Sequence, residues 1–122
     1  MQITKQKVSP KVQKDILEMF AQLIADISQK EDALVFINDF LTETERIALA
    51  KRLAIIFYLD KKMSYQQIRK QIGVSSATIA SVQSCLDQKS AGFLLALQYL
   101  KAEEWAGKWS QKLTSIFGKK DK

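Results

Sequence analysis

The chain has 122 residues, 47% of them hydrophobic, and a formal net charge of +6, so it is long enough for one domain and too short for two ordinary ones. One Pro and four Gly leave little material for turns, which favours long helices with short connections. The positive charge suits an anionic partner, either nucleic acid or a membrane surface. The single cysteine, Cys85, excludes an internal disulfide and fits a reducing cytosol.

Two broad classes of protein are disfavoured by the sequence. No uninterrupted apolar stretch approaches the roughly 20 residues that span a bilayer, and the N-terminus lacks the apolar run of a signal peptide. We therefore expect a soluble, cytoplasmic protein with no membrane partner. The sequence has no His, no Gly-rich phosphate loop and no cluster with metal-ligand spacing, so we expect neither an enzyme nor a cofactor or metal site.

Three helices are predicted in the first half of the chain. Ser9 and Pro10 form a helix-start pair, with Ser as the N-cap and Pro at the first helical position. A second, short helix follows a break at residues 28–31 and is apolar around much of its circumference, so it should be enclosed on several sides. Thr42 opens the third helix with a capping box to Glu45.

The stretch at residues 63–86 predicts two short helices joined by a tight turn. Ser64 and Gln67 form a capping box at the start of the first helix. Gly73 follows that helix at a position that often needs positive φ. Val74 should pack under the turn, and Ser75 starts the second helix.

The apolar spacing within residues 63–86 gives each of the two helices a buried face. Ile68 and Ile72 form that of the first; Ile79, Val82 and Leu86 form that of the second. The outward face of the second helix carries small residues: Ser76, Ala77, Ala80, Ser81 and Ser84. This is the layout of a helix-turn-helix, whose second helix enters the DNA major groove. An ordinary helical hairpin is the alternative that the motif alone leaves open.

The last third of the chain predicts a further apolar helix over residues 93–100, after a polar break at 87–90. Apolar residues then recur at helical spacing in Trp105, Trp109, Leu113 and Ile116. Core or dimer packing is the favoured reading of this stretch, and a cationic amphipathic helix on a membrane is the alternative. Residues 108–122 form a basic tail. We predict one helical domain over residues 1–122. Its predicted helices carry more apolar surface than a monomer of this size can bury, which predicts a homodimer.

Several motifs resemble the Trp repressor superfamily. They are Leu41-Thr42-x-x-Glu45-Arg46-x-Ala48-Leu49-x-x-Arg52, Met63-Ser64 and Gly73-Val74-Ser75-x-Ala77-Thr78-Ile79. The continuation Val82-x-x-Cys85-Leu86 and Gly92-Phe93 is more similar to the repressor-related YerC/YecD group. The resemblance covers roughly residues 30–95. It implies an all-α, multi-helix intertwined homodimer in which each subunit projects a helix-turn-helix.

The same resemblance argues against tryptophan as an effector. In the Trp repressor, the ligand lies between an Arg of the third helix and an Arg-Gly pair of the recognition helix. Arg52 matches the first Arg, but Ser81 and Val82 stand at the Arg-Gly positions. A Ser hydroxyl cannot reproduce the bidentate contact of a guanidinium with a carboxylate. The small-molecule effector is therefore unknown, and tryptophan is not expected.

The predicted surface for double-stranded DNA combines a basic approach with an uncharged recognition helix. Residues 74–86 contain no charged side chain, whereas residues 60–73 carry a local charge of +3. Cationic side chains would hold phosphates, and small or amide side chains would face base edges. The expected DNA-binding residues are Lys61, Lys62, Gln66, Arg69, Lys70, Ser75, Ser76, Ala77, Thr78, Ala80 and Ser81.

Two functions remain in competition at this stage. The first is a sequence-specific DNA-binding transcriptional regulator of the Trp repressor-like type that does not respond to tryptophan. The second is a protein-interaction module derived from such a regulator, with weak or lost DNA binding. The uncharged stretch at 74–86 favours the second function, because phosphate contacts supply most non-specific DNA affinity.

Overall fold

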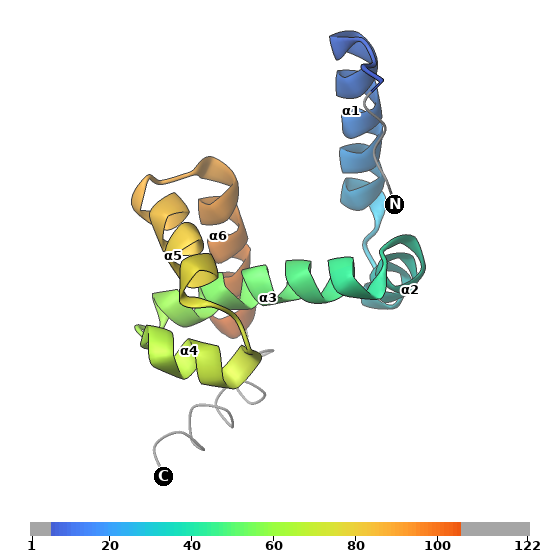
Figure 1. The fold of residues 1–122 in the computed structure, drawn as a ribbon. Coiled ribbons are helices and arrows are strands. Elements are labelled where there is room, and N and C mark those ends of the chain that lie inside the picture. Colours follow the sequence, from blue (N-terminus) through green and yellow to red (C-terminus); the bar gives the residue numbers. More distant parts are fainter. Residues whose placement is uncertain (1–5, 106–122) are drawn as a thin grey trace. The chain divides into compact units, whose positions relative to one another are not determined.

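The computed structural model describes residues 6–105, and its regular structure within that range is entirely helical (Figure 1). The all-α class predicted from the sequence is confirmed. The intertwined dimer and the single domain over 1–122 stay predictions. Trp109, Leu113, Ile116 and the basic tail lie outside the described residues. The helices are α1 (Pro10–Asp26), α2 (Lys30–Phe40), α3 (Glu43–Asp60), α4 (Tyr65–Ile72), α5 (Ser76–Asp87) and α6 (Ala91–Trp105).

The first of two compact units, Met1–Glu43, contains α1 and α2. Ser9 caps α1 as predicted, because its hydroxyl accepts a hydrogen bond from the Val12 amide at 3.2 Å. Phe36 stacks on Phe40 with ring centroids 4.7 Å apart, and Phe20 stacks on Phe40 at 5.8 Å. Neither helix contains a buried residue. Both helices therefore leave their apolar side chains largely exposed.

The second unit, Thr44–Lys122, contains the buried core. Four consecutive residues of α3, Ile55 to Tyr58, are at most 4% exposed. Four successive side chains point around the full circumference of a helix, so this part of α3 is enclosed on all sides. A helix segment with no polar side has no amphipathic periodicity, so the spacing of apolar residues does not mark Ile55 and Tyr58 as buried.

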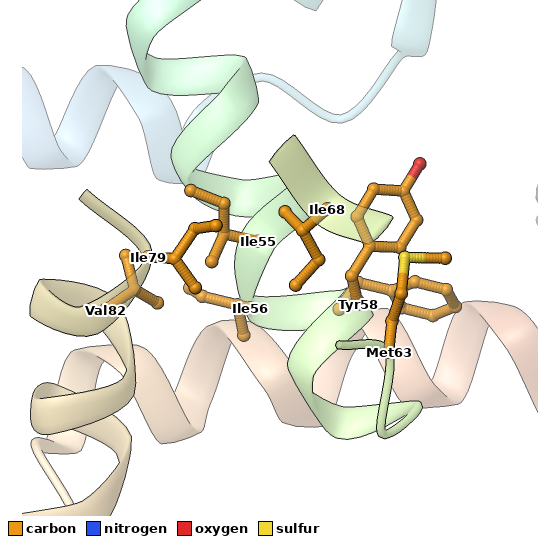
Figure 2. Close-up of a cluster of buried hydrophobic side chains, with 8 residues drawn as sticks. Ile55, Ile56, Tyr58, Met63, Ile68, Ile79 and Val82 are labelled. Atoms are coloured by element: carbon orange, nitrogen blue, oxygen red, sulfur yellow. The ribbon is translucent and has the colours of Figure 1, made fainter. Parts of the chain in front are cut away.

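The core joins α3 to the two helices of the predicted motif. Figure 2 shows Ile55 of α3 between Ile68 of α4 and Ile79 of α5, with Val82 beyond Ile79. All three isoleucines are fully buried. Burying an aliphatic side chain contributes roughly 1.5–3 kcal/mol, so these contacts fix α4 and α5 against α3. Partly buried residues of α6 complete the cluster: Phe93, Ala96, Leu97 and Leu100.

No helix among residues 6–105 has the length and apolar content needed to cross a membrane. The apolar helix predicted over 93–100 is α6, which begins at Ala91 and continues to Trp105. Its neighbours within the unit include α5.

Candidate nucleic-acid interface

The helix α4 begins at the capping box that the sequence predicted. The Ser64 hydroxyl accepts from the Gln67 amide at 3.1 Å, and the Gln67 side chain accepts from the Ser64 amide at 2.9 Å. The predicted capping box is therefore complete. Because both bonds satisfy amides that have no partner within the helix, the first turn of α4 has a defined beginning.

The turn between α4 and α5 depends on Gly73. Its φ of 64° and ψ of 58° place it in the left-handed region, which costs Gly little. The Gly73 amide donates to the Arg69 carbonyl at 2.9 Å and so closes the end of α4. Val74 then packs against the core. The predicted turn geometry is confirmed at both residues.

The two faces of α5 differ as the spacing predicted. Ile79 is fully buried and Val82 is 3% exposed, while Leu86 is partly buried against the same cluster. The opposite face is exposed and consists of small residues. Its members are Ser76, Ala77, Ala80, Ser81 and Ser84. A helix of this kind can approach another surface closely.

Two of the predicted DNA-binding residues have structural partners at the start of α5. The Ser75 hydroxyl accepts from the Thr78 amide at 3.1 Å and is therefore the N-cap. The hydroxyls of Ser75 and Thr78 also lie 2.9 Å apart and form a hydrogen bond. These bonds give both residues a local role in beginning the helix.

Arg69 spans the turn to Ser76, the first residue of α5. Its Nη1 donates to Ser76 Oγ at 3.0 Å. A guanidinium has no acceptor, so the Ser76 oxygen accepts and its own proton remains available to donate. Both side chains are exposed. The structure thus connects a predicted phosphate-binding residue with a predicted base-reading residue.

The remaining predicted residues lie around the same motif. Lys62 is exposed and has a positive φ of 63° in the connection between α3 and α4. The Lys61 amine lies 5.2 Å from the centre of the Phe57 ring, in a cation–π arrangement. Gln66 and Lys70 are exposed on α4. All eleven predicted residues therefore belong to α4, α5 or the segments that lead into them.

Sequence reasoning missed Lys51 of α3. Its amine donates to the Gly73 carbonyl at 3.1 Å. The two residues are 22 positions apart, and local patterns of capping and periodicity carry no signal over that distance. Lys51 therefore adds a cationic side chain at the turn, in addition to Arg69 and Lys70 in the last turn of α4.

The three residues at the positions of the Trp repressor effector site differ in their burial. Arg52 and Ser81 are exposed, whereas Val82 is buried among the core side chains. The Val82 side chain thus stands at a position where the Trp repressor has a Gly, which has no side chain.

Among residues 6–105, no group of three or more His, Cys, Asp or Glu side chains is placed to hold a metal ion. Cys85 is half-buried on α5, as expected for a small packing residue. Burial raises the pKa of the Tyr58 hydroxyl in the core, which disfavours its ionisation.

The family model described as "Trp repressor protein" matches residues 15–101. The chain belongs to the Trp repressor protein family. The match includes α3 and the α4–α5 motif together with most of α6. The match confirms the resemblance to the Trp repressor superfamily that the sequence predicted.

A relative of this Trp repressor family member is the "Uncharacterized protein YerC" of Bacillus subtilis (strain 168). The two are 29% identical over 91 residues, which are 75% of this chain and 86% of the relative. The expected relation to the YerC group is therefore also confirmed. No solved structure gives a significant match.

Proposed function

We propose that the chain is a sequence-specific DNA-binding transcriptional regulator, with α5 as the recognition helix. One observation carries the proposal. The side of α5 that holds Ile79 and Val82 is buried against α3, while the side that holds Ser76 and Ala80 is exposed. A recognition helix needs this division, because one side must attach to the domain and the other must reach base edges.

Base contacts would come from short side chains. Ser76 can donate its proton outward, because its oxygen already accepts from Arg69. The acceptors in the major groove are guanine O6 and N7, adenine N7 and thymine O4. Ala77 and Ala80 would contact a thymine methyl. Phosphate contacts would come from the exposed cations before the turn, Lys62 and Lys70, and from the outer donors of Arg69.

The proposal includes a homodimer that does not respond to tryptophan. Exposed apolar side chains along α1 and α2 favour a dimer, because monomers rarely expose contiguous apolar patches of more than a few hundred Å². A two-fold axis would present two recognition helices to two half-sites. The buried Val82 and the exposed Ser81 favour an effector other than tryptophan, or none.

The second candidate function is a protein-interaction module. It is favoured by the lack of charge on α5 before Asp87, since α5 itself then offers no cation to phosphate. In that case the exposed small residues of α5 would pack on a protein surface.

Selection of fragments from the source genome, at about 50 and 200 mM salt, separates the two functions. We expect a few roughly palindromic sites that survive the higher salt. Replacing Arg69 and Lys70 together with Ala should abolish their enrichment. The matched control, Lys11→Ala with Lys14→Ala, removes the same charge from exposed positions of α1 and should leave it unchanged. Diffuse binding that vanishes with salt, or equal effects of both pairs, would contradict the proposal.

A further inference from the structure

Gly73, which closes α4 and leads into α5, is held on both sides of its Cα. Its amide donates to Arg69 of α4 at 2.9 Å, and its carbonyl accepts from Lys51 of α3 at 3.1 Å. The Lys51 side chain is half-buried. The turn is thus attached to α3 by a specific polar contact in addition to the packing of Ile68 and Ile79.

The contact between Lys51 and Gly73 has a favourable electrostatic setting. Carbonyls at the end of a helix carry partial negative charge, and a cation beside them is stabilising. A hydrogen bond from an ammonium is also stronger than one between neutral groups. The Gly73 carbonyl is followed by Val74 and then by Ser75, the N-cap of α5. The orientation of the peptide group between Gly73 and Val74 therefore affects where α5 begins and which way it points.

We propose that Lys51 is a positioning residue that holds the turn at Gly73 and so sets the direction in which α5 presents its exposed face. Its effect on DNA rests on the proposed function, whereas its hold on the turn is a property of the folded chain. A phosphate contact is the competing role for an amine at this place. The two roles differ in what removal of the amine does to the turn and to the salt dependence of binding.

Amide hydrogen exchange tests the hold on the turn without DNA. Lys51→Met keeps most of the side-chain stem but removes the donor, and Lys51→Arg keeps a cationic donor. With Lys51→Met, the amides of Gly73 and Ile79 should exchange about three- to tenfold faster, the effect expected for loss of one hydrogen bond. Lys51→Arg should stay near the wild-type rates.

The Ile68 amide is the internal control for that measurement, because it bonds to Ser64 at the other end of α4. Its exchange should not change in Lys51→Met. Unchanged exchange at Gly73 and Ile79 would overturn the proposal. Equal acceleration at Ile68 would also overturn it, since that result indicates a general loss of stability.

DNA affinity measured against salt tests the consequence for α5. Lys51→Met should weaken binding at every salt concentration without changing the slope of log affinity against log salt. The matched control is Lys70→Met, which should lower the slope by about one phosphate contact. A lower slope for Lys51→Met, or unchanged affinity, would overturn the proposed role. If the wild-type chain bound no DNA, the proposed function would fail, while the exchange rates would still decide whether Lys51 holds the turn.

Discussion

The Ser76 hydroxyl accepts a hydrogen bond from Arg69, which affects how it can contact DNA. Because Ser76 Oγ accepts from Arg69 at 3.0 Å, its proton stays available to donate to a DNA acceptor in the proposed complex. Ser76→Ala should therefore remove the preference for one base pair in each half-site, at a cost of about 0.5–1.5 kcal/mol for the preferred base. Binding to libraries randomised at single positions measures this change. Ser84→Ala, on the same exposed face, is the control, and a preference kept in Ser76→Ala would contradict the assignment.

The Tyr58 hydroxyl predicts a pH dependence of stability. Burial raises its pKa in the folded state, so the neutral form is stabilised by folding, and this contribution is lost as the pH rises above the unfolded value near 10. Between pH 8 and about 11, Tyr58→Phe should lose less free energy of unfolding than the wild type. Urea unfolding at both pH values measures the difference. Equal losses in Tyr58→Phe and the wild type would contradict the prediction.

Among the helices, α4 is short enough for its cap to matter. It has eight residues and a complete capping box. Ser64→Ala removes the side-chain acceptor and should lower the free energy of unfolding by about 0.5–2 kcal/mol. Urea unfolding measures this value. Ser81→Ala, within α5, is the matched control and should change stability little or raise it slightly, because Ala favours helix interiors. Equal losses in the two variants would contradict the role of the cap.

Helix boundaries could be predicted from the sequence because their signals are local. The hydroxyls of Ser9, Ser64 and Ser75 each cap a helix as expected. Gly73 adopts the conformation that favours Gly, and the spacing of Ile79 and Val82 identified the buried face of α5. Each of these features depends on residues within one or two turns of a helix. The fold class followed from them.

The contacts around the candidate site could be predicted only in part. Sequence reasoning placed Arg69 near the DNA backbone but did not foresee its bond to Ser76 across the turn. It did not identify Lys51, because the partner carbonyl of Gly73 lies in the turn after α4, 22 positions along the chain. It also missed the burial of Ile55 and Tyr58, since a helix enclosed on all sides has no periodic apolar face. These contacts and this burial depend on how helices distant in the sequence pack together in the fold.

At the scale of the whole molecule, the apolar side chains of α1 are exposed to solvent and need a partner surface that buries them. Ile16 is 52% exposed, Leu23 is 43% exposed and Ile24 is 52% exposed. No residue of α1 is buried. Burial of such side chains is worth roughly 25 cal/mol for each Å² removed from water. A second copy of the chain is the partner that is always present at equal concentration.

Sedimentation equilibrium should therefore give about twice the chain mass of 13.9 kDa. Ile16→Asp with Leu23→Asp places two charges on the apolar face of α1 and should shift the mass toward that of the monomer, because a buried unpaired charge opposes association. Ala21→Asp with Ala25→Asp adds the same charge on the opposite side of the helix and should leave the mass unchanged. A compact monomer in the wild type, or equal dissociation by both pairs, would show that α1 is not the dimer surface.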